Sequence, residues 1–370
     1  MGKRPFTFAD TFEVVADAVP DHTAIVTEDR RLTFAEVDER ATRLAHALQE
    51  RGIGAGDHVG LYLYNGTESV EGMLAAWKIR AVPINVNYRY VEEELVYLFD
   101  DAELAAVIHH QEFTPTLAAV VDQVPGVRAF LSVADDSGVD LAGLETDDYE
   151  EALAAAGTER DFGERSGDDL YILYTGGTTG MPKGVMWRQE DIFFAAMDLS
   201  AMGLADAPSA PEELAERVKE TSGTMTMATA APLMHGAAQW AAFICFHQGN
   251  TLVLTSSRKF DPPAIWRMVE QEKVTTMTVV GDAMARPLAD ELQANPDAYD
   301  LSSFFALGSG GAILSEGVKQ QFTEARPDLI ITDLLMPSMN GYEFVRKLRN
   351  GPRWPSRRWS SRPRPTSRAR

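Results

Sequence analysis

The chain has 370 residues, of which 45% are hydrophobic, and a formal net charge of −21 at pH 7. This length allows two or three ordinary domains or one large α/β domain. The acidic charge argues against nucleic acid as a main partner, because phosphates would be repelled. The single cysteine, Cys245, excludes an internal disulfide. With no signal peptide and no apolar run of membrane-spanning length, we expect a cytoplasmic protein.

The first 110 residues alternate between helical and strand patterns. Thr33 and Glu36 fit a capping box in front of apolar residues at three- and four-residue steps, which predicts a helix. Apolar runs at strand length alternate with further helical patterns, and this order is typical of a parallel sheet with both faces covered. The expected elements are a helix at Thr33–Gln49, a strand at His58–Tyr64, helices at Glu68–Ile79 and Val91–Phe99, and a strand at residues 104–110.

The second half continues with apolar strands separated by loops. The stretch from Asp135 to Asp169 is acidic and weakly patterned, with short helical pieces, and residues 205–223 look like an exposed loop with a short helix. No internal repeat is present. Further strands are expected at Leu170–Tyr174, Thr251–Thr255, Val274–Gly281 and Phe304–Gly311.

The stretch LYILYTGGTTGMPKG carries the strongest chemical signal. An apolar strand runs directly into Thr175, Gly176, Gly177, Thr178, Thr179 and Gly180. Glycines let backbone N–H groups turn toward an anion, the threonine hydroxyls add donors, and Lys183 supplies a positive charge for a polyphosphate. The spacing is not that of a Walker loop. The alternative is an ordinary Gly/Thr turn between two strands, with Lys183 as a solvated surface lysine.

The whole string resembles the phosphate loop of the adenylate-forming (AMP-binding) superfamily, which includes acyl-CoA synthetases, luciferases and peptide adenylation domains. LTFAEVDERATRLAHALQERGIGAGDHVGLYLYNGTESVEGMLAAWKIRAVPINVNYRY is similar to the N-terminal core motifs of that family. APLMHGAAQW places His235 where the family has a histidine beside the acyl pocket. LGSGGAILSEGVKQQF is similar to the strand end that packs on adenine, lined here by Gly310, Gly311 and Ala312. The resemblance covers residues 6–332 and is closest to bacterial fatty-acyl-CoA synthetases of the long-chain or sterol-acid type.

The resemblance implies a two-step reaction. A carboxylate attacks the α-phosphorus of ATP to give an acyl-adenylate and pyrophosphate, and the thiol of coenzyme A then attacks the activated carbonyl. ATP, Mg²⁺ and coenzyme A are the implied cofactors, with a small carboxylic acid as the other partner. Thr175, Lys183 and His235 are the implied catalytic residues, while the metal ligands are not identified. The implied fold is α/β, a large N-terminal domain with two mostly parallel sheet subdomains and without the small C-terminal domain.

Several of these residues also have plainer structural interpretations. His235 could be a satisfied histidine in a small-residue helix, and Gly310 and Gly311 could simply permit close packing at a strand end. Cys245 lies among phenylalanines and is most simply a packing residue. His109 and His110 end an expected strand, and the sequence identifies no partner for them.

The resemblance stops after LIITD. The family continues with an adenine-stacking aromatic residue and a magnesium-binding glutamate, whereas Leu334 to Met339 here contain neither. The later ribose-binding aspartate and the second-domain lysine are also missing. We therefore expect a chain that is weak or inactive in the full reaction.

The stretch PDLIITDLLMPSMNGYEF resembles a two-component receiver around its phosphoacceptor, a place that Asp333 would hold. The partner acids and the later lysine of a receiver are not found, and the plainer interpretation is that Asp333 is an ordinary aspartate at a strand end. This divides the chain into a truncated AMP-binding domain (1–332), a receiver-like fragment (327–349) and a basic tail (350–370). Seven arginines and no acid in residues 351–370 break the composition sharply.

Three interpretations follow from this organisation. The chain is an acyl-CoA ligase fragment, a fusion regulated by phosphorylation at Asp333, or a non-catalytic module that binds a nucleotide or an acyl group. A chimeric join followed by a frameshift would explain the change at LIITD and the basic tail. The sequence defines neither the acyl chain nor the oligomeric state.

Overall fold

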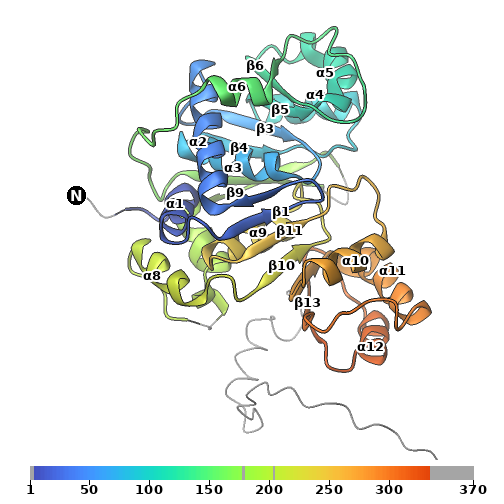
Figure 1. The fold of residues 1–370 in the computed structure, drawn as a ribbon. Helices are drawn as coiled ribbons and strands as arrows, with labels where there is room; N and C mark the ends of the chain where they lie inside the picture. The colour runs from blue at the N-terminus through green and yellow to red at the C-terminus, as the bar shows by residue number, and fades with distance from the viewer. Residues whose placement is uncertain (1–3, 177–179, 203–204, 334–370) are drawn as a thin grey trace, which may run out of the picture.

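The computed structural model describes residues 4–176, 180–202 and 205–333 (Figure 1). The residues are arranged in two large sheets and one hairpin, separated and covered by helices. The first sheet has the strand order β4-β3-β5-β6-β7, and all its neighbouring strands are parallel. Its strands are β3 (His58–Tyr62), β4 (Val82–Asn85), β5 (Leu104–His110), β6 (Ala129–Val133) and β7 (Asp147–Asp148).

The second sheet has the order β14-β13-β12-β10-β11-β1-β2, in which only the β1–β2 pair is antiparallel. Its strands are β1 (Thr23–Val26), β2 (Arg31–Thr33), β10 (Thr226–Thr229), β11 (Thr251–Leu254), β12 (Thr276–Val279), β13 (Ala306–Ser309) and β14 (Ile330–Asp333). The expected α/β architecture with two mostly parallel sheets is therefore confirmed.

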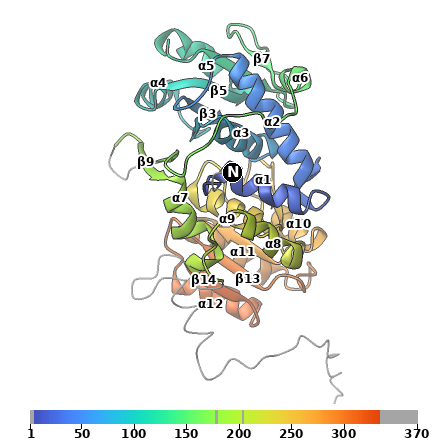
Figure 2. The same ribbon diagram turned by 90° about the vertical axis from the view of Figure 1, so that its left-hand side faces the viewer.

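Helices form three layers around these sheets, as the two views show (Figures 1 and 2). The layer between the sheets contains α1 (Phe8–Ala18), α2 (Phe34–Glu50), α3 (Thr67–Lys78) and α9 (Gly236–His247). The outer face of the first sheet is covered by α4 (Glu92–Asp101) and α5 (Thr114–Val120). The outer face of the second sheet is covered by α10 (Pro262–Gln271), α11 (Gly281–Ala294) and α12 (Glu316–Ala325).

Shorter elements connect these layers. The short helix expected within residues 205–223 is α8 (Glu212–Thr221), which packs against α1 and buries Leu214 and Val218. The remaining short helices are α6 (Tyr149–Ala155), α7 (Gln189–Ile192), a π turn (Phe193–Met197) and 3₁₀ turns at Gln111–Phe113, Val121–Gln123 and Leu199–Met202.

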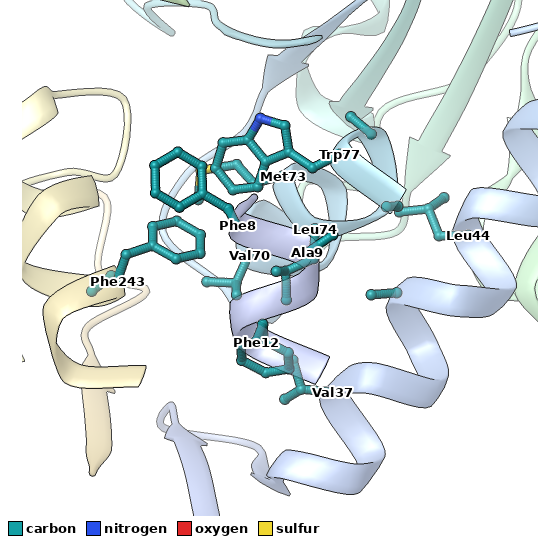
Figure 3. Packing of buried hydrophobic residues seen from close by; sticks show 14 of the residues in the cluster. Phe8, Ala9, Phe12, Val37, Leu44, Val70, Met73, Leu74, Trp77 and Phe243 are labelled. Carbon is teal, nitrogen blue, oxygen red and sulfur yellow. The ribbon is translucent and has the colours of Figure 1, made fainter. Parts of the chain in front are cut away.

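The central core explains why the strands read as continuous apolar runs. Along β5, Ala106 and Ile108 face the middle layer whereas Val107 faces the outer helices, because side chains of a strand alternate between the two faces. Rings from three helices interlock in the middle layer, where the centroids of Phe8 and Trp77 lie 4.6 Å apart (Figure 3). Burying each such ring contributes on the order of 2 kcal/mol.

A buried ion network lies within this layer. The Lys78 ammonium is fully buried and lies 2.8 Å from carboxylate oxygens of both Glu13 and Asp38. Arg165 and Arg160 provide further cations to the same two carboxylates. The network joins α1, α2 and α3. The packing of the three helices therefore depends on buried ion pairs, in which each carboxylate is neutralised by a neighbouring cation instead of by water.

The helices and strands predicted from local sequence patterns are present, and their ends differ from the prediction by at most two residues. The predicted capping box is present, with Glu36 N–H donating to Thr33 Oγ1 at 3.2 Å and Thr33 N–H donating to Glu36 Oε2 at 2.7 Å. The helix expected at Glu68–Ile79 spans Thr67–Lys78, and the strand expected at His58–Tyr64 ends at Tyr62. Cys245 is fully buried, as expected. No helix among the described residues is long and apolar enough to cross a bilayer.

The string LIITD is part of the second sheet. The strand β14 pairs in parallel with β13, and Asp333 lies opposite Ser309 in the ladder. The receiver-like fragment after Asp333 and the basic tail at 350–370 lie outside the described residues. The proposed division of the chain at residues 327–349 is therefore not tested by the structure beyond Asp333.

Candidate functional site

The carboxyl ends of the parallel strands from both sheets converge on one region, which is where α/β folds place ligand sites. Asn65 follows β3 and Asn85 ends β4 in the first sheet, and both donate hydrogen bonds to the segment that follows β10 in the second sheet. The start of the predicted phosphate loop, at Tyr174 and Thr175, and the segment before His235 lie beside the Asn85 contacts.

The predicted phosphate loop joins two antiparallel strands, β8 (Leu170–Thr175) and β9 (Lys183–Arg188), in a two-stranded sheet. Thr175 and Lys183 are the last pair of the ladder, and both are exposed. Gly180 has a φ of +148°, a conformation that favours glycine. Gly177, Thr178 and Thr179 lie outside the described residues. A hydroxyl group and an ammonium group therefore stand at the two ends of the loop.

The plainer interpretation of this motif, an ordinary Gly/Thr turn, also predicts a loop between two strands. The backbone path alone therefore does not distinguish a phosphate loop from an ordinary turn. The surroundings of the hairpin are more specific. The Asn85 side chain, with its residue only 8% exposed, exchanges two hydrogen bonds with Tyr174: its Nδ2 donates to the Tyr174 carbonyl and its Oδ1 accepts from the Tyr174 N–H, both at 2.8 Å. The same Nδ2 donates to the Met234 carbonyl at 2.7 Å. One buried amide thus joins the residues immediately before Thr175 and His235.

His235 lies at the N-cap of α9 and is an exposed residue, so it is not the satisfied histidine within a helix that the alternative predicted. The protein around its ring desolvates it in part and the Arg89 cation lies nearby, and both effects lower the pKa of the imidazole. His235 is therefore held toward its neutral form, in which one ring nitrogen can accept a hydrogen bond.

A second asparagine holds the same segment. Asn65 Oδ1 accepts from the Leu233 N–H at 2.7 Å, and its Nδ2 donates to the Ala231 carbonyl at 3.4 Å. On the other side, Gln239 of α9 accepts from the Tyr171 hydroxyl at 2.7 Å and donates to the Leu233 carbonyl at 2.8 Å. The position of the segment before His235 is thereby defined from both sides by side-chain amides.

The third predicted part of the site, Gly310, Gly311 and Ala312, follows β13 and leads toward α12. Gly310 is buried, Gly311 is exposed with a φ of +81°, and Ala312 is partly exposed. The plainer interpretation, close packing at a strand end, fits Gly310, but a Cβ on Gly311 would have only one atom within 4 Å. The loop is thus open on one side, as a surface that receives a flat ligand must be.

The start of α11 fixes this loop. Gly281 N–H donates to Ser309 Oγ at 3.1 Å, and a Cβ on Gly281 would lie 2.7 Å from the Ile313 carbonyl oxygen. The Asp282 carboxylate accepts from both the N–H and the hydroxyl of Ser315 at 2.7 Å. These hydrogen bonds from Ser315 lower the pKa of Asp282.

A cationic and aromatic cleft adjoins the segment that holds His235. The Arg258 guanidinium lies 5.4 Å from the Tyr64 ring centroid and 2.8 Å from a Glu112 oxygen. This cleft was not predicted from the sequence, although the pairs Tyr88-Arg89 and Arg258-Lys259 are its signal there. Its walls come from both sheets: Tyr64, Asn65, Tyr88, Arg89, Ala230, Pro232, Thr255, Ser257, Arg258, Lys259, Phe260, Ile265 and Met284.

The two histidines of β5 have local partners and do not form a metal site. Within the described ranges, no group of three Asp, Glu, His or Cys side chains is placed to hold a metal ion. His109 Nε2 lies 3.3 Å from Thr146 Oγ1, and His110 Nδ1 accepts from the Tyr64 N–H at 3.1 Å. Both histidines are thus packing residues, and His110 also supports the cleft.

Comparisons with known proteins identify the family of the chain. The family described as AMP-binding enzyme matches residues 12–334. A 3-oxocholest-4-en-26-oate–CoA ligase of Rhodococcus rhodochrous is 41% identical over 338 residues, which are 90% of this chain and 60% of that protein. A medium/long-chain-fatty-acid–CoA/3-oxocholest-4-en-26-oate–CoA ligase of Mycobacterium tuberculosis is 40% identical, with the same coverage of both chains. The chain thus spans about three-fifths of the length of these relatives.

Solved structures show the same fold. The inhibitor-bound N-terminal domain of FACL13 from Mycobacterium tuberculosis has a TM-score of 0.73 at 23% identity, with 92% of this chain and 80% of that chain covered. A long-chain-fatty-acid-CoA ligase from Archaeoglobus fulgidus has a TM-score of 0.72 at 22% identity, with 90% and 64% covered. Fold, motif order and relatives agree, and the chain belongs to the AMP-binding enzyme family.

Proposed function

We propose that this chain binds ATP and a carboxylic acid and follows the chemistry of an AMP-forming acid–thiol ligase. The observation that carries the proposal is the joining of the phosphate-loop hairpin to the segment before His235 through Asn85. An ordinary turn needs no such connection, whereas a site that brings a phosphate and a carboxylate together needs both segments in one fixed arrangement.

Each part of the site has a role in this proposal. Thr175, Gly176 and Gly180, with Gly177, Thr178 and Thr179, would donate hydrogen bonds to the phosphates of ATP, and Lys183 would neutralise part of their charge. Gly310, Gly311 and Ala312 would contact the adenine. His235, neutral at physiological pH, would lie beside the reacting carboxylate and orient it by a hydrogen bond.

Positive charge near the transferring group stabilises the charge that develops on the phosphates. Mg²⁺ would add to this stabilisation when bound, but no protein ligand for it is assigned. The cleft at Arg89, Arg258 and Lys259 offers cations and aromatic faces, the groups that recognise the phosphates and adenine of coenzyme A.

The acid is proposed to be long and apolar. Support comes from the relatives, whose names specify fatty acids and a sterol-derived acid. Because the residues directly after Asp333 lack the expected aromatic residue and glutamate, we propose that turnover is slow or absent. A non-catalytic role in binding a nucleotide or an acyl group is the alternative, and it requires the same site.

The receiver resemblance at residues 327–349 is a separate prediction, supported by its sequence alone. Phosphorylation of the wild-type protein by acetyl phosphate, lost in Asp333→Asn, would support a regulated fusion. Sequencing of independent isolates across codons 325–355 would test the chimeric join, which recurrence of the same reading frame in all of them would refute.

Pyrophosphate release tests the proposed function. The purified chain is incubated with ATP, Mg²⁺ and a panel of fatty and sterol-derived acids, beside Lys183→Ala and the matched control Lys273→Ala, an exposed lysine paired with Asp300. Release that depends on the acid and on Lys183, but not on Lys273, supports ligase chemistry. ATP binding without pyrophosphate release supports the non-catalytic alternative. If the folded protein neither binds ATP nor releases pyrophosphate, both interpretations are rejected.

A further inference from the structure

Asn85 makes three hydrogen bonds that no local element requires. Asn85 is the last residue of β4, and its side-chain amide contacts two segments that are far away in the sequence. Tyr174 is 89 residues from Asn85 and Met234 is 149 residues from it. The three partner groups are backbone atoms, so the contacts specify the path of the main chain and not the identity of a side chain.

The location of the three contacts gives them a consequence. Tyr174 directly precedes Thr175, the first residue of the phosphate-loop motif, and Met234 directly precedes His235. Because β8 pairs only with β9 among the described strands, its position relative to the large sheets depends on side-chain contacts. A two-stranded sheet alone is marginally stable, so external support determines where the two strands lie.

The burial of Asn85 raises the cost of losing these contacts. Its residue is 8% exposed, and both carbonyls that it binds are in the part-buried to buried environment of the strand ends. A backbone group left without a partner in such a place is strongly disfavoured. An alternative arrangement of the two segments would therefore have to provide replacement partners, and the arrangement with Asn85 is favoured.

We propose that Asn85 is a positioning residue that holds Thr175, the first residue of the phosphate-loop motif, and His235 in one relative geometry. The inference rests on the proposed function and extends it, since Asn85 lies outside the phosphate-loop motif and the sequence assigns it no role. Asn65 acts on a smaller part of the site. It contacts Ala231 and Leu233 but makes no hydrogen bond to β8, so it fixes only the segment before His235.

Hydrogen exchange without ligand separates these roles. Asn85→Ala is expected to accelerate exchange by about tenfold both in residues 171–176 and in residues 231–236. Asn85→Asp keeps the acceptor for the Tyr174 N–H but loses both donor contacts, so residue 174 stays slow while residues 231–236 accelerate. Asn65→Ala is expected to affect only residues 231–236. The exposed Asn295, whose side chain contacts Glu291, provides the control, and Asn295→Ala changes neither segment.

Binding of ATP to the same four variants and the wild type, measured by calorimetry, completes the test. Asn85→Ala raises the dissociation constant for ATP about tenfold, whereas Asn65→Ala and Asn295→Ala change it less than about threefold. The inference is overturned if Asn85→Ala leaves either segment protected, or if it accelerates exchange throughout the chain and leaves the affinity unchanged. Absence of ATP binding by the wild type would reject the proposed function, while the exchange pattern still shows whether Asn85 holds the two segments.

Discussion

The carboxylate of Asp282 accepts two hydrogen bonds from Ser315, one from the backbone N–H and one from the hydroxyl, each at 2.7 Å. Ser315 is the N-cap of α12, but its hydroxyl is used by Asp282 and not by its own helix. The first turn of α11 thereby holds the loop that leads into α12. This loop contains Gly310, Gly311 and Ala312.

Replacing Asp282 therefore loosens the proposed adenine loop. We expect Asp282→Ala to lower the free energy of unfolding by about 1 kcal/mol and to weaken ATP binding several-fold, because Ser315 loses both acceptors. Asp282→Asn should retain most of the affinity, since the amide oxygen still accepts the Ser315 N–H and the amide nitrogen can donate to the hydroxyl. Arg286→Ala, which removes only the partly exposed ion pair of Asp282, is the control. Equal ATP affinities for Asp282→Ala and wild type would contradict this role.

The buried ion network predicts a strong effect on stability. Lys78→Met would leave the carboxylates of Glu13 and Asp38 without their shared cation, although Arg165 and Arg160 remain. We expect a loss of about 3 kcal/mol in the free energy of unfolding by guanidinium chloride. The control is Lys219→Met, which removes an exposed pair with Glu216 and should change stability by less than about 0.5 kcal/mol. Similar values for the two variants would refute the importance of the network.

Acid is expected to destabilise the protein well above the range in which its carboxylates titrate. Burial lowers the pKa of His109, His110 and His247 to about 4 each, from an ordinary value of 6.5. Between these values the unfolded chain binds protons that the folded chain excludes, so stability falls as the pH decreases from 6.5 to 4. Each histidine contributes a slope of up to about 1.4 kcal/mol per pH unit in that interval.

The pH dependence can be assigned to a single residue. His247 is fully buried near the end of α9, 3.1 Å from Thr11 Oγ1, and His247→Gln should reduce the slope between pH 6.5 and 4 by about a third. His22→Gln, at an exposed position, should leave it unchanged. Unfolding at fixed pH values measures the slope, and the assignment fails if the two variants behave alike. Below about pH 4.5 a further loss of stability is expected from Glu13. Burial favours the protonated form of this carboxyl group, but Lys78 and Arg165 lower its pKa to about 2, so the unfolded chain takes up a proton that the folded chain does not.

The thiol of Cys245 should report unfolding directly. It is fully buried in α9, and burial raises the pKa of the thiol well above its ordinary value. We expect no reaction with a thiol reagent in the native protein and complete reaction in guanidinium chloride. A rapid reaction in buffer alone would show that the middle layer opens readily, contrary to the packing seen around Phe243 and Trp77.

The parts of the fold that depend on short-range signals could be predicted from the sequence. The capping box of Thr33 and Glu36 and the apolar runs of β3 and β5 act over a few residues, so their patterns are visible locally. The strand β9 was expected only in the alternative of a Gly/Thr turn between two strands, because Lys183–Arg188 has exposed residues on both faces and lacks an alternating pattern. The short helix α8 was expected, but its packing against α1 was not, because only Leu214 and Val218 mark its buried side.

The candidate site shows the same division. Its loops could be found because glycines, threonines and Lys183 form a continuous motif, whereas Asn85, Asn65 and Asp282 could not. Each of these acts on partners 33 to 168 residues away, and a single asparagine or aspartate in a sequence does not indicate its partner. The cationic cleft was missed for the same reason, since its walls come from the ends of strands in different sheets.

The most direct test of the proposed site is calorimetric titration of ATP into the folded wild-type chain and into Lys183→Ala, with Lys273→Ala as the control. We predict one ATP per chain for the wild type and for Lys273→Ala, with affinity reduced at least about tenfold in Lys183→Ala because the cation at the end of the phosphate loop is lost. Absence of binding to the folded wild type, or equal affinity for wild type and Lys183→Ala, would contradict the claim that the β8–β9 hairpin is part of a nucleotide site.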